Sequence, residues 1–240
     1  MDDNQRVPRL RGISEPSKEW ILRSQYLIPI MVSCDSEVTE NEYQAALNGI
    51  VDVVKLSGSN RRVSSLRDKP WASGNYSSVE WYLTKVNQRD GQVDADHLCQ
   101  MFIHEPWQNY PKTHLDIVIV SKDLYAHGLA WCFGNTYPFQ ASAQSVFRFR
   151  GERSQVKLDL IRRTLRHETG HLLGIPGPVG SHPRIYEKGG AHCSHLCTMR
   201  QGWSLAEFKS QMMEEQKAGV IFCQDCLNEL RTIQAKMKPV

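Results

Sequence analysis

The feature that most constrains this 240-residue sequence is the run from Arg166 to Gly174, which contains the pattern His-Glu-x-x-His. Residues four apart on a helix lie on one face, so His167 and His171 would present two imidazoles to a single point. Zinc binds such nitrogens at about 2.0–2.1 Å, and Glu168 beside them could accept a proton from water on the metal. The plainer interpretation is two ordinary helix histidines and a surface glutamate, so the surrounding sequence has to decide.

The residues around the motif favour the metal site. Apolar residues recur at helical spacing across residues 154–174, which predicts a helix there. Gly174 directly follows the motif and Pro176 stands two residues later. Glycine suits the left-handed position after a helix, and proline cannot continue one. The helix therefore ends just beyond the two candidate ligands, and the chain can turn back toward the metal.

A second set of candidate ligands lies near the C-terminus. Cys193 and Cys197 form one pair, and Cys223 and Cys226 form another. Four thiolates in two close pairs match a closed tetrahedral zinc site. Such a site can supply about 10–16 kcal/mol, comparable with the ~5–15 kcal/mol stability of a whole domain. The alternatives are unrelated buried thiols or, less favoured, a redox pair. The remaining cysteines are expected in the core: Cys34, Cys99 and Cys132.

Composition narrows the class of protein. With 40% hydrophobic and 23% charged residues, the chain is typical of a globular protein, and its net charge of +3 argues against a nucleic-acid platform or a membrane-surface protein. The apolar run at residues 26–32 is too short to span a bilayer. Asp2 and Asp3 stand where a secretory signal would carry positive charge. Together with the metal-like cysteine spacing, these observations predict an intracellular, cytoplasmic protein.

The element pattern predicts a mixed α/β (α+β) fold. Strands are expected at residues 26–32, 78–86, 115–120 and 145–150. Helices are expected at 40–55, 94–102 and 154–174, then from Ser204, and from Cys223 to about Ile233, with loops at 57–75 and 175–191. We expect a flexible arm at residues 1–24, an upper catalytic part at 25–176 and a lower part at 177–240.

The segment from Ser145 to Arg150 alternates apolar and arginine residues, which is typical of an edge strand. The arginines could discourage pairing with other sheets. The same edge could instead pair with an extended substrate peptide. The two interpretations are compatible.

Taken together, these motifs resemble those of the archaemetzincins, a cysteine-rich branch of the metzincin metalloproteases. The matching elements are His167 to Gly174, His192-Cys193, Cys197-Thr198-Met199, and Cys223 with Cys226. The resemblance implies a twisted mixed sheet, an active-site helix and a small C-terminal part that is stapled by zinc. It implies zinc-dependent hydrolysis of peptide bonds and two zinc ions per chain. It assigns His167, His171 and His192 to the catalytic zinc, Glu168 to the base, Met199 to the methionine turn and the four cysteines to structural zinc.

The third ligand is the least settled residue of this set. Besides His192, the candidates are His182, His195 and Glu187. His182 and Glu187 lie in the Gly/Pro-rich stretch, and His195 lies inside the loop that the first cysteine pair would close. His192 precedes that loop and comes shortly before Met199, so one short segment could deliver both, and we favour it. The long loop between Gly174 and His192 then lowers stability only slightly, because the entropy cost of closing a loop grows only logarithmically with its length.

Three other functions remain open at this point. One is a gluzincin-like peptidase with Glu187 or Glu207 as the third ligand. Another is a SprT-like protease that acts on DNA–protein crosslinks, although the weak net charge makes nucleic acid an unexpected partner. The third is a zinc-binding protein without turnover, in which Glu168 would have no purpose.

Overall fold

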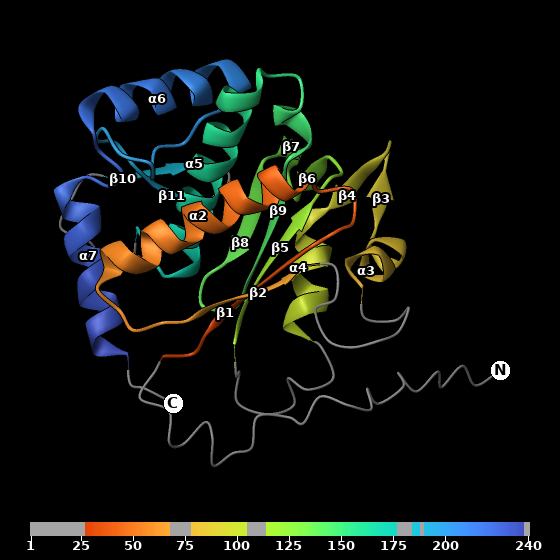
Figure 1. Cartoon of the computed structure of the whole chain (residues 1–240), viewed down its shortest axis with the longest axis horizontal. Coiled ribbons are helices and arrows are strands. Elements are labelled where there is room, and N and C mark those ends of the chain that lie inside the picture. The colour runs from red at the N-terminus through yellow and green to blue at the C-terminus, as the bar shows by residue number, and fades with distance from the viewer. Residues whose placement is uncertain (1–26, 68–77, 105–113, 177–183, 188–189, 238–240) are drawn as a thin grey trace, which may run out of the picture.

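The computed structural model describes residues 27–67, 78–104, 114–176, 184–187 and 190–237 (Figure 1). Its main sheet has five strands in the order β2-β1-β5-β9-β8. Neighbouring strands are parallel except at β8, which is antiparallel to β9 and forms one edge. The strand bounds are β1 Ile30–Cys34, β2 Val63–Arg67, β5 Leu115–Val120, β8 Gly134–Tyr137 and β9 Ala141–Ser145. The fold is therefore mixed α/β, as predicted.

Helices cover both faces of this sheet (Figure 1). Successive residues of a strand point to opposite faces, and β5 is buried along its whole length. Ile117 and Ile119 of β5 belong to the core that includes helices α2 (Glu40–Ser57) and α5 (Ser154–Leu172). Val118 and Val120 belong to a second core with α3 (Val79–Lys85) and α4 (Ala95–Ile103). The predicted strand at 115–120 is thus confirmed, and it is a central strand covered on both faces.

Helix α2 fixes α5 against the sheet. A capping box starts α2, because the Thr39 hydroxyl accepts from the Glu42 amide and the Glu42 carboxylate accepts from the Thr39 amide. The two helices then cross closely at Gly49, where a Cβ atom would lie 2.5 Å from the Arg162 carbonyl oxygen. Only glycine permits this approach, and it sets the position of the helix that carries the His-Glu-x-x-His motif.

Smaller elements complete the molecule. A four-stranded sheet contains β3 (Gln88–Arg89), β4 (Gln92–Asp94), β6 (Leu124–Ala126) and β7 (Leu129–Cys132). Strands β10 (Arg184–Glu187) and β11 (Gly190–Cys193) form an antiparallel hairpin. Helices α6 (Leu205–Ala218) and α7 (Gln224–Lys236) lie at the end of the molecule opposite α3 (Figure 1). No helix among the described residues is long and apolar enough to cross a membrane.

Several sequence predictions are wrong. The predicted strand at 78–86 is instead helix α3 (Val79–Lys85), because Ser78 caps the helix and the buried residues Val79, Tyr82 and Leu83 follow helical spacing. The predicted edge strand from Ser145 to Arg150 does not exist either. Strand β9 ends at Ser145 and lies between β5 and β8, and the chain continues into a short 3₁₀ helix at Phe147–Phe149.

The loops and the first strand also need correction. Strand β2 lies within the predicted loop 57–75, and the β10–β11 hairpin lies within the predicted loop 175–191. The first strand is shifted toward the C-terminus, to Ile30–Cys34, since Pro29 precedes it. The predicted arm at residues 1–24 lies outside the described residues. The division into upper and lower parts at residue 176 stays a prediction.

Candidate metal and active site

Three histidines from two elements converge. His167 and His171 lie one turn apart on α5, and His192 lies on β11, which pairs with β10. One ring nitrogen from each lies within 4.8 Å of those of the other two. His167 and His192 are buried, at 6% and 2% exposure. Among the candidates for the third ligand whose side chains the structure describes, His192 is the one that lies beside this pair.

The tautomers of the helix pair fit a metal ion. His167 Nδ1 lies 2.7 Å from the Thr198 carbonyl oxygen, which accepts its proton and leaves the lone pair of this ring on Nε2. His171 is hydrogen-bonded to the backbone of Ile175. The two Nε2 atoms face each other at 3.1 Å. Ligands at ~2.0–2.1 Å from a tetrahedral zinc are separated by about 3.3 Å, so the spacing matches. With both Nε2 atoms unprotonated, a cation between them would accept both lone pairs.

Burial keeps these imidazoles neutral. It lowers the pKa of His171 to about 3 and that of His192 to about 4, and it places the pKa of His167 well below its usual value. The neighbouring histidines lower the pKa values of His167 and His171 further. Neutral imidazole is the form that binds metal, so the ligand set is available across the physiological pH range.

Glu168 lies beside this cluster and is also buried, at 8% exposure. Burial raises the pKa of its carboxyl to about 7, although hydrogen bonds from Thr136 and Gln144 act in the opposite direction. The Thr136 hydroxyl lies 2.6 Å from Glu168 Oε2. A carboxylate placed in this way can exchange a proton with a reactant at neutral pH.

The Met199 side chain packs against α5 at Gly170, where the helix has no side chain. It is fully buried, and a Cβ atom at Gly170 would lie 2.5 Å from its sulfur. Glycine inside a helix costs about 1 kcal/mol relative to alanine, and here it makes room for the thioether. The Met199 carbonyl accepts a hydrogen bond from the Cys193 amide at 2.9 Å, which ties this turn to β11 and so to His192.

A buried ion pair braces the same turn. Arg163 lies one helical turn before His167 and is 1% exposed. Its guanidinium donates two hydrogen bonds to Glu215 of α6, at 3.0 and 2.9 Å, and one to Gln211. Glu215 also accepts from the Thr198 hydroxyl at 3.1 Å. Because the Thr198 carbonyl contacts His167, this pair connects α6 to the orientation of a candidate ligand.

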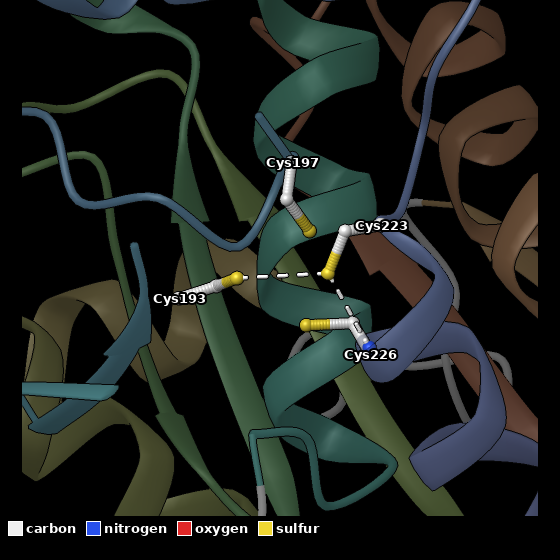
Figure 2. Close-up of side chains that lie close together, drawn as sticks. All are labelled: Cys193, Cys197, Cys223 and Cys226. Carbon is white, nitrogen blue, oxygen red and sulfur yellow. Dashed lines mark hydrogen bonds between the residues drawn. The ribbon is translucent and has the colours of Figure 1, made fainter. Parts of the chain in front are cut away.

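The four predicted cysteines form a second cluster. Figure 2 shows their sulfur atoms gathered around one centre, and they lie within 4.8 Å of one another. Cys193 Sγ and Cys223 Sγ are 3.7 Å apart, whereas a disulfide would need about 2.05 Å. Zinc–sulfur bonds of ~2.3 Å in a tetrahedron imply about 3.8 Å between sulfurs, so the spacing fits zinc.

Backbone amides near the four cysteines are placed to stabilise negative charge on the sulfur atoms. The amides of His195, Met199 and Cys226 point at sulfurs of the cluster, with N–S distances of 3.4–3.5 Å. Cys223 is also the cap of α7, since its sulfur accepts from the Cys226 amide. Amide donors stabilise thiolates, so the loop and the helix start are arranged for a metal that binds the deprotonated form.

The other candidate residues lie elsewhere. His195 is half-exposed and lies 3.5 Å from Asp225, beside Cys223 and not beside the three imidazoles. Glu207 is exposed and accepts from the Trp203 amide at the start of α6. Glu187 lies on β10, paired in register with Gly190, and His182 falls outside the described residues.

The sequence analysis missed several residues around the site. The contacts of Glu168 with Thr136 and Gln144 depend on how β8 pairs with β9, and no local sequence pattern predicts them. The role of Gly170 had a signal, since a glycine at the centre of a strongly predicted helix indicates close packing. The Arg163–Glu215 pair joins residues far apart in the sequence, so spacing alone could not reveal it.

The fold and the two clusters define an α/β protein with a helix-borne His-Glu-x-x-His motif and a separate four-cysteine cluster that could hold a metal ion. The chain is similar to the archaemetzincins. It is 27% identical to "Archaemetzincin" from Archaeoglobus fulgidus over 122 residues. That match spans 50% of this chain and 62% of the relative. No protein-family model matches the chain.

Solved structures show the same fold. The archaemetzincin of Methanopyrus kandleri superimposes with a TM-score of 0.59 at 21% identity, covering 89% of this chain and 98% of that one. The archaemetzincin of Archaeoglobus fulgidus, solved in complex with malonate, gives a TM-score of 0.53 at 19% identity. That superposition covers 84% of this chain and 99% of the other.

Proposed function

We propose that this protein is a zinc-dependent peptidase that hydrolyses peptide bonds. The observation that carries the proposal is the convergence of three neutral imidazoles, two of them buried and one half-buried, beside the buried carboxylate of Glu168. In this proposal His167, His171 and His192 hold the catalytic zinc. Met199 packs against Gly170 below them. The similarity to archaemetzincins in sequence and fold supports the assignment.

When bound, zinc acts as a Lewis acid that lowers the pKa of water to about 7 and polarises a carbonyl oxygen. The chain supplies the remaining chemistry. Glu168 accepts a proton from the attacking water and returns it to the leaving amine. Thr198 orients His167 by accepting a hydrogen bond from its Nδ1, which keeps Nε2 free for the metal. Burial of the site excludes bulk water from these groups.

We also propose that the four cysteines, Cys193, Cys197, Cys223 and Cys226, hold a second, structural zinc. Their sulfur spacing and the amides directed at them support this role. Two zinc ions per chain follow. Because thiolate sites need reduced cysteines, we place the protein in a reducing, intracellular compartment.

The substrate is proposed to be an extended peptide that pairs with the edge of the main sheet. The edge strand is β8 (Gly134–Tyr137), which replaces the segment predicted from the sequence. Its residue Thr136 contacts Glu168, so a peptide lying along β8 would pass close to the base. Nucleic acid stays an unexpected partner, given the small net charge.

Glu168→Gln tests the mechanism. Glutamine keeps the shape and hydrogen bonding of the side chain but cannot accept a proton, so turnover of a fluorogenic peptide library should fall at least about 10²-fold while zinc content is unchanged. Retention of near wild-type turnover would mean that another group is the base. Absence of turnover in the zinc-loaded wild type would favour a binding protein.

A further inference from the structure

Glu168 is held by residues from two neighbouring strands. Thr136 Oγ1 of β8 lies 2.6 Å from Glu168 Oε2 and 2.6 Å from Ser142 Oγ of β9. Ser142 Oγ in turn accepts from Gln144 Nε2 at 2.7 Å. Gln144 also donates a side-chain hydrogen bond to Glu168. The carboxylate is therefore the end of a row of hydrogen-bonded side chains that extends into the sheet.

The donor-to-acceptor direction of these hydrogen bonds follows from the groups at the two ends of the row, the Gln144 amide and the Glu168 carboxylate. The amide nitrogen of Gln144 can only donate, so Ser142 accepts from it. The Ser142 hydroxyl can then donate to Thr136 at 2.6 Å, a much shorter contact than its 3.5 Å approach to the Asn135 carbonyl oxygen. Thr136 then uses its one hydrogen for Glu168 Oε2, since an ionised carboxylate can only accept. Every donor in the row thus points toward Glu168, and hydrogen bonds aligned in this way strengthen one another.

The strand pairing builds this arrangement. Thr136 is paired with Ser142 and Gly134 with Gln144 in the β8–β9 register. A Cβ atom at Gly134 would lie 2.2 Å from Gln144 Oε1, so glycine leaves the space that the Gln144 side chain fills. The amide is fully enclosed, at 1% exposure. The network is therefore held by packing as well as by hydrogen bonds.

The opposite face of β8 is anchored separately. Side chains alternate along a strand, so Asn135 and Tyr137 point away from Glu168. Both donate to Asp96 Oδ1 of α4, at 2.8 and 3.1 Å. Asp96 also accepts from the His127 amide. Thr136 thus lies on a strand that is fixed from both sides, which keeps its hydroxyl at a constant position relative to α5.

We propose that Thr136 is a positioning residue for Glu168: its hydroxyl, backed by Ser142 and Gln144, holds Oε2 and leaves Oε1 to handle the proton of the attacking water. This inference rests on the proposed function. Because the same strand forms the sheet edge, a peptide that pairs with β8 is aligned by the element that aligns the base. Strand β8 then positions both the substrate and Glu168, so the distance between the scissile bond and the base does not depend on a mobile loop.

Thr136→Val tests the proposal, since valine matches threonine in shape and lacks the hydroxyl. We expect kcat for a fluorogenic peptide to fall by about 10- to 100-fold, the scale of a misplaced catalytic group, with KM changed by less than about threefold. Zinc content and the melting temperature should stay close to those of the wild type. Thr136→Ser, which restores the hydroxyl, should recover most of kcat. Thr84→Val removes an exposed hydroxyl on α3 and serves as the matched control.

A binding measurement separates this proposal from the proposed function. Acetohydroxamate binds zinc and donates a hydrogen bond to a neighbouring carboxylate, so its affinity by calorimetry should fall several-fold in Thr136→Val and recover in Thr136→Ser. Wild-type kcat and acetohydroxamate affinity in a folded, zinc-loaded Thr136→Val protein would overturn the positioning role. If Thr136→Val does not fold, Ser142→Ala takes its place with a smaller expected loss, and wild-type values there would equally overturn it. A wild type that binds acetohydroxamate without hydrolysing any peptide would contradict the proposed function instead.

Discussion

Removal of the Glu215 carboxylate should strongly destabilise the protein. Its Oε2 accepts from Arg163 Nε and Thr198 Oγ1, and its Oε1 accepts from Arg163 Nη2, all within 3.1 Å. In Glu215→Ala the Arg163 guanidinium, which is 1% exposed, would remain charged and buried without its carboxylate partner, keeping its hydrogen bond to Gln211 and its contact with the Phe208 ring. Breaking a buried pair by removing one partner costs about 3–5 kcal/mol, because the other charge is left uncompensated.

This free energy translates into a measurable shift of the melting temperature. For a chain of this size, 1 kcal/mol corresponds to about 2–4 °C, so Glu215→Ala should melt roughly 6–20 °C below the wild type. Differential scanning calorimetry or circular dichroism can measure the shift. The affinity for the exchangeable zinc should also fall about 10- to 100-fold, because the Thr198 segment that orients His167 loses its anchor.

The neighbouring residue Glu214 provides the matched control. It pairs with Arg200 at 3.0 Å, but its side chain is 53% exposed. An exposed pair contributes at most about 1 kcal/mol, so Glu214→Ala should shift the melting temperature by no more than about 4 °C. Equal melting temperatures for the two variants would refute the reasoning. The double variant Arg163→Met, Glu215→Leu should recover part of the loss, since no unpaired charge then remains buried.

Three further predictions concern the metals. Purification without chelators should yield two zinc ions per chain by elemental analysis, one of them exchangeable by mild chelation, and a value of one or none would eliminate the two-site proposal. Cys223→Ser should lower both the melting temperature and solubility by opening the four-thiolate cluster, whereas a variant with wild-type stability and both zinc ions would show that the cluster is not structural. His192→Ala should lose the exchangeable zinc while His195→Ala keeps both ions, and full zinc content in His192→Ala would rule out that residue as a ligand.

The sequence predicted the parts of the site whose geometry is local. The spacing of His167 and His171 determines their relation once the helix forms, and the pairs of cysteines lie on short loops whose reach is limited. The position of His192 could be favoured on its distance from Met199, and the structure brings it to the helix pair. Histidines and cysteines at these spacings have few roles other than metal binding, so they can be recognised in a sequence.

The support of Glu168 could not be predicted in this way. Thr136, Ser142 and Gln144 are common residue types, and only the β8–β9 register brings them to the carboxylate. The edge-strand prediction failed for a different reason. In a 3₁₀ helix residues three apart share a side, which places Val146 and Phe149 in the core while Phe147 stays half exposed. Over so few residues this pattern looks like strand alternation.

Strand β11 carries His192 and Cys193 as consecutive residues, so a single peptide unit joins a ligand of each cluster. Metal loading should therefore have an order. The four-thiolate cluster gathers β11, the Cys197 loop and the start of α7, so a metal bound there would further fix the segment that carries the third imidazole. Zinc added to the metal-free protein should occupy the thiolates first and the imidazoles second, so that a cell short of zinc would accumulate chains that are folded but inactive.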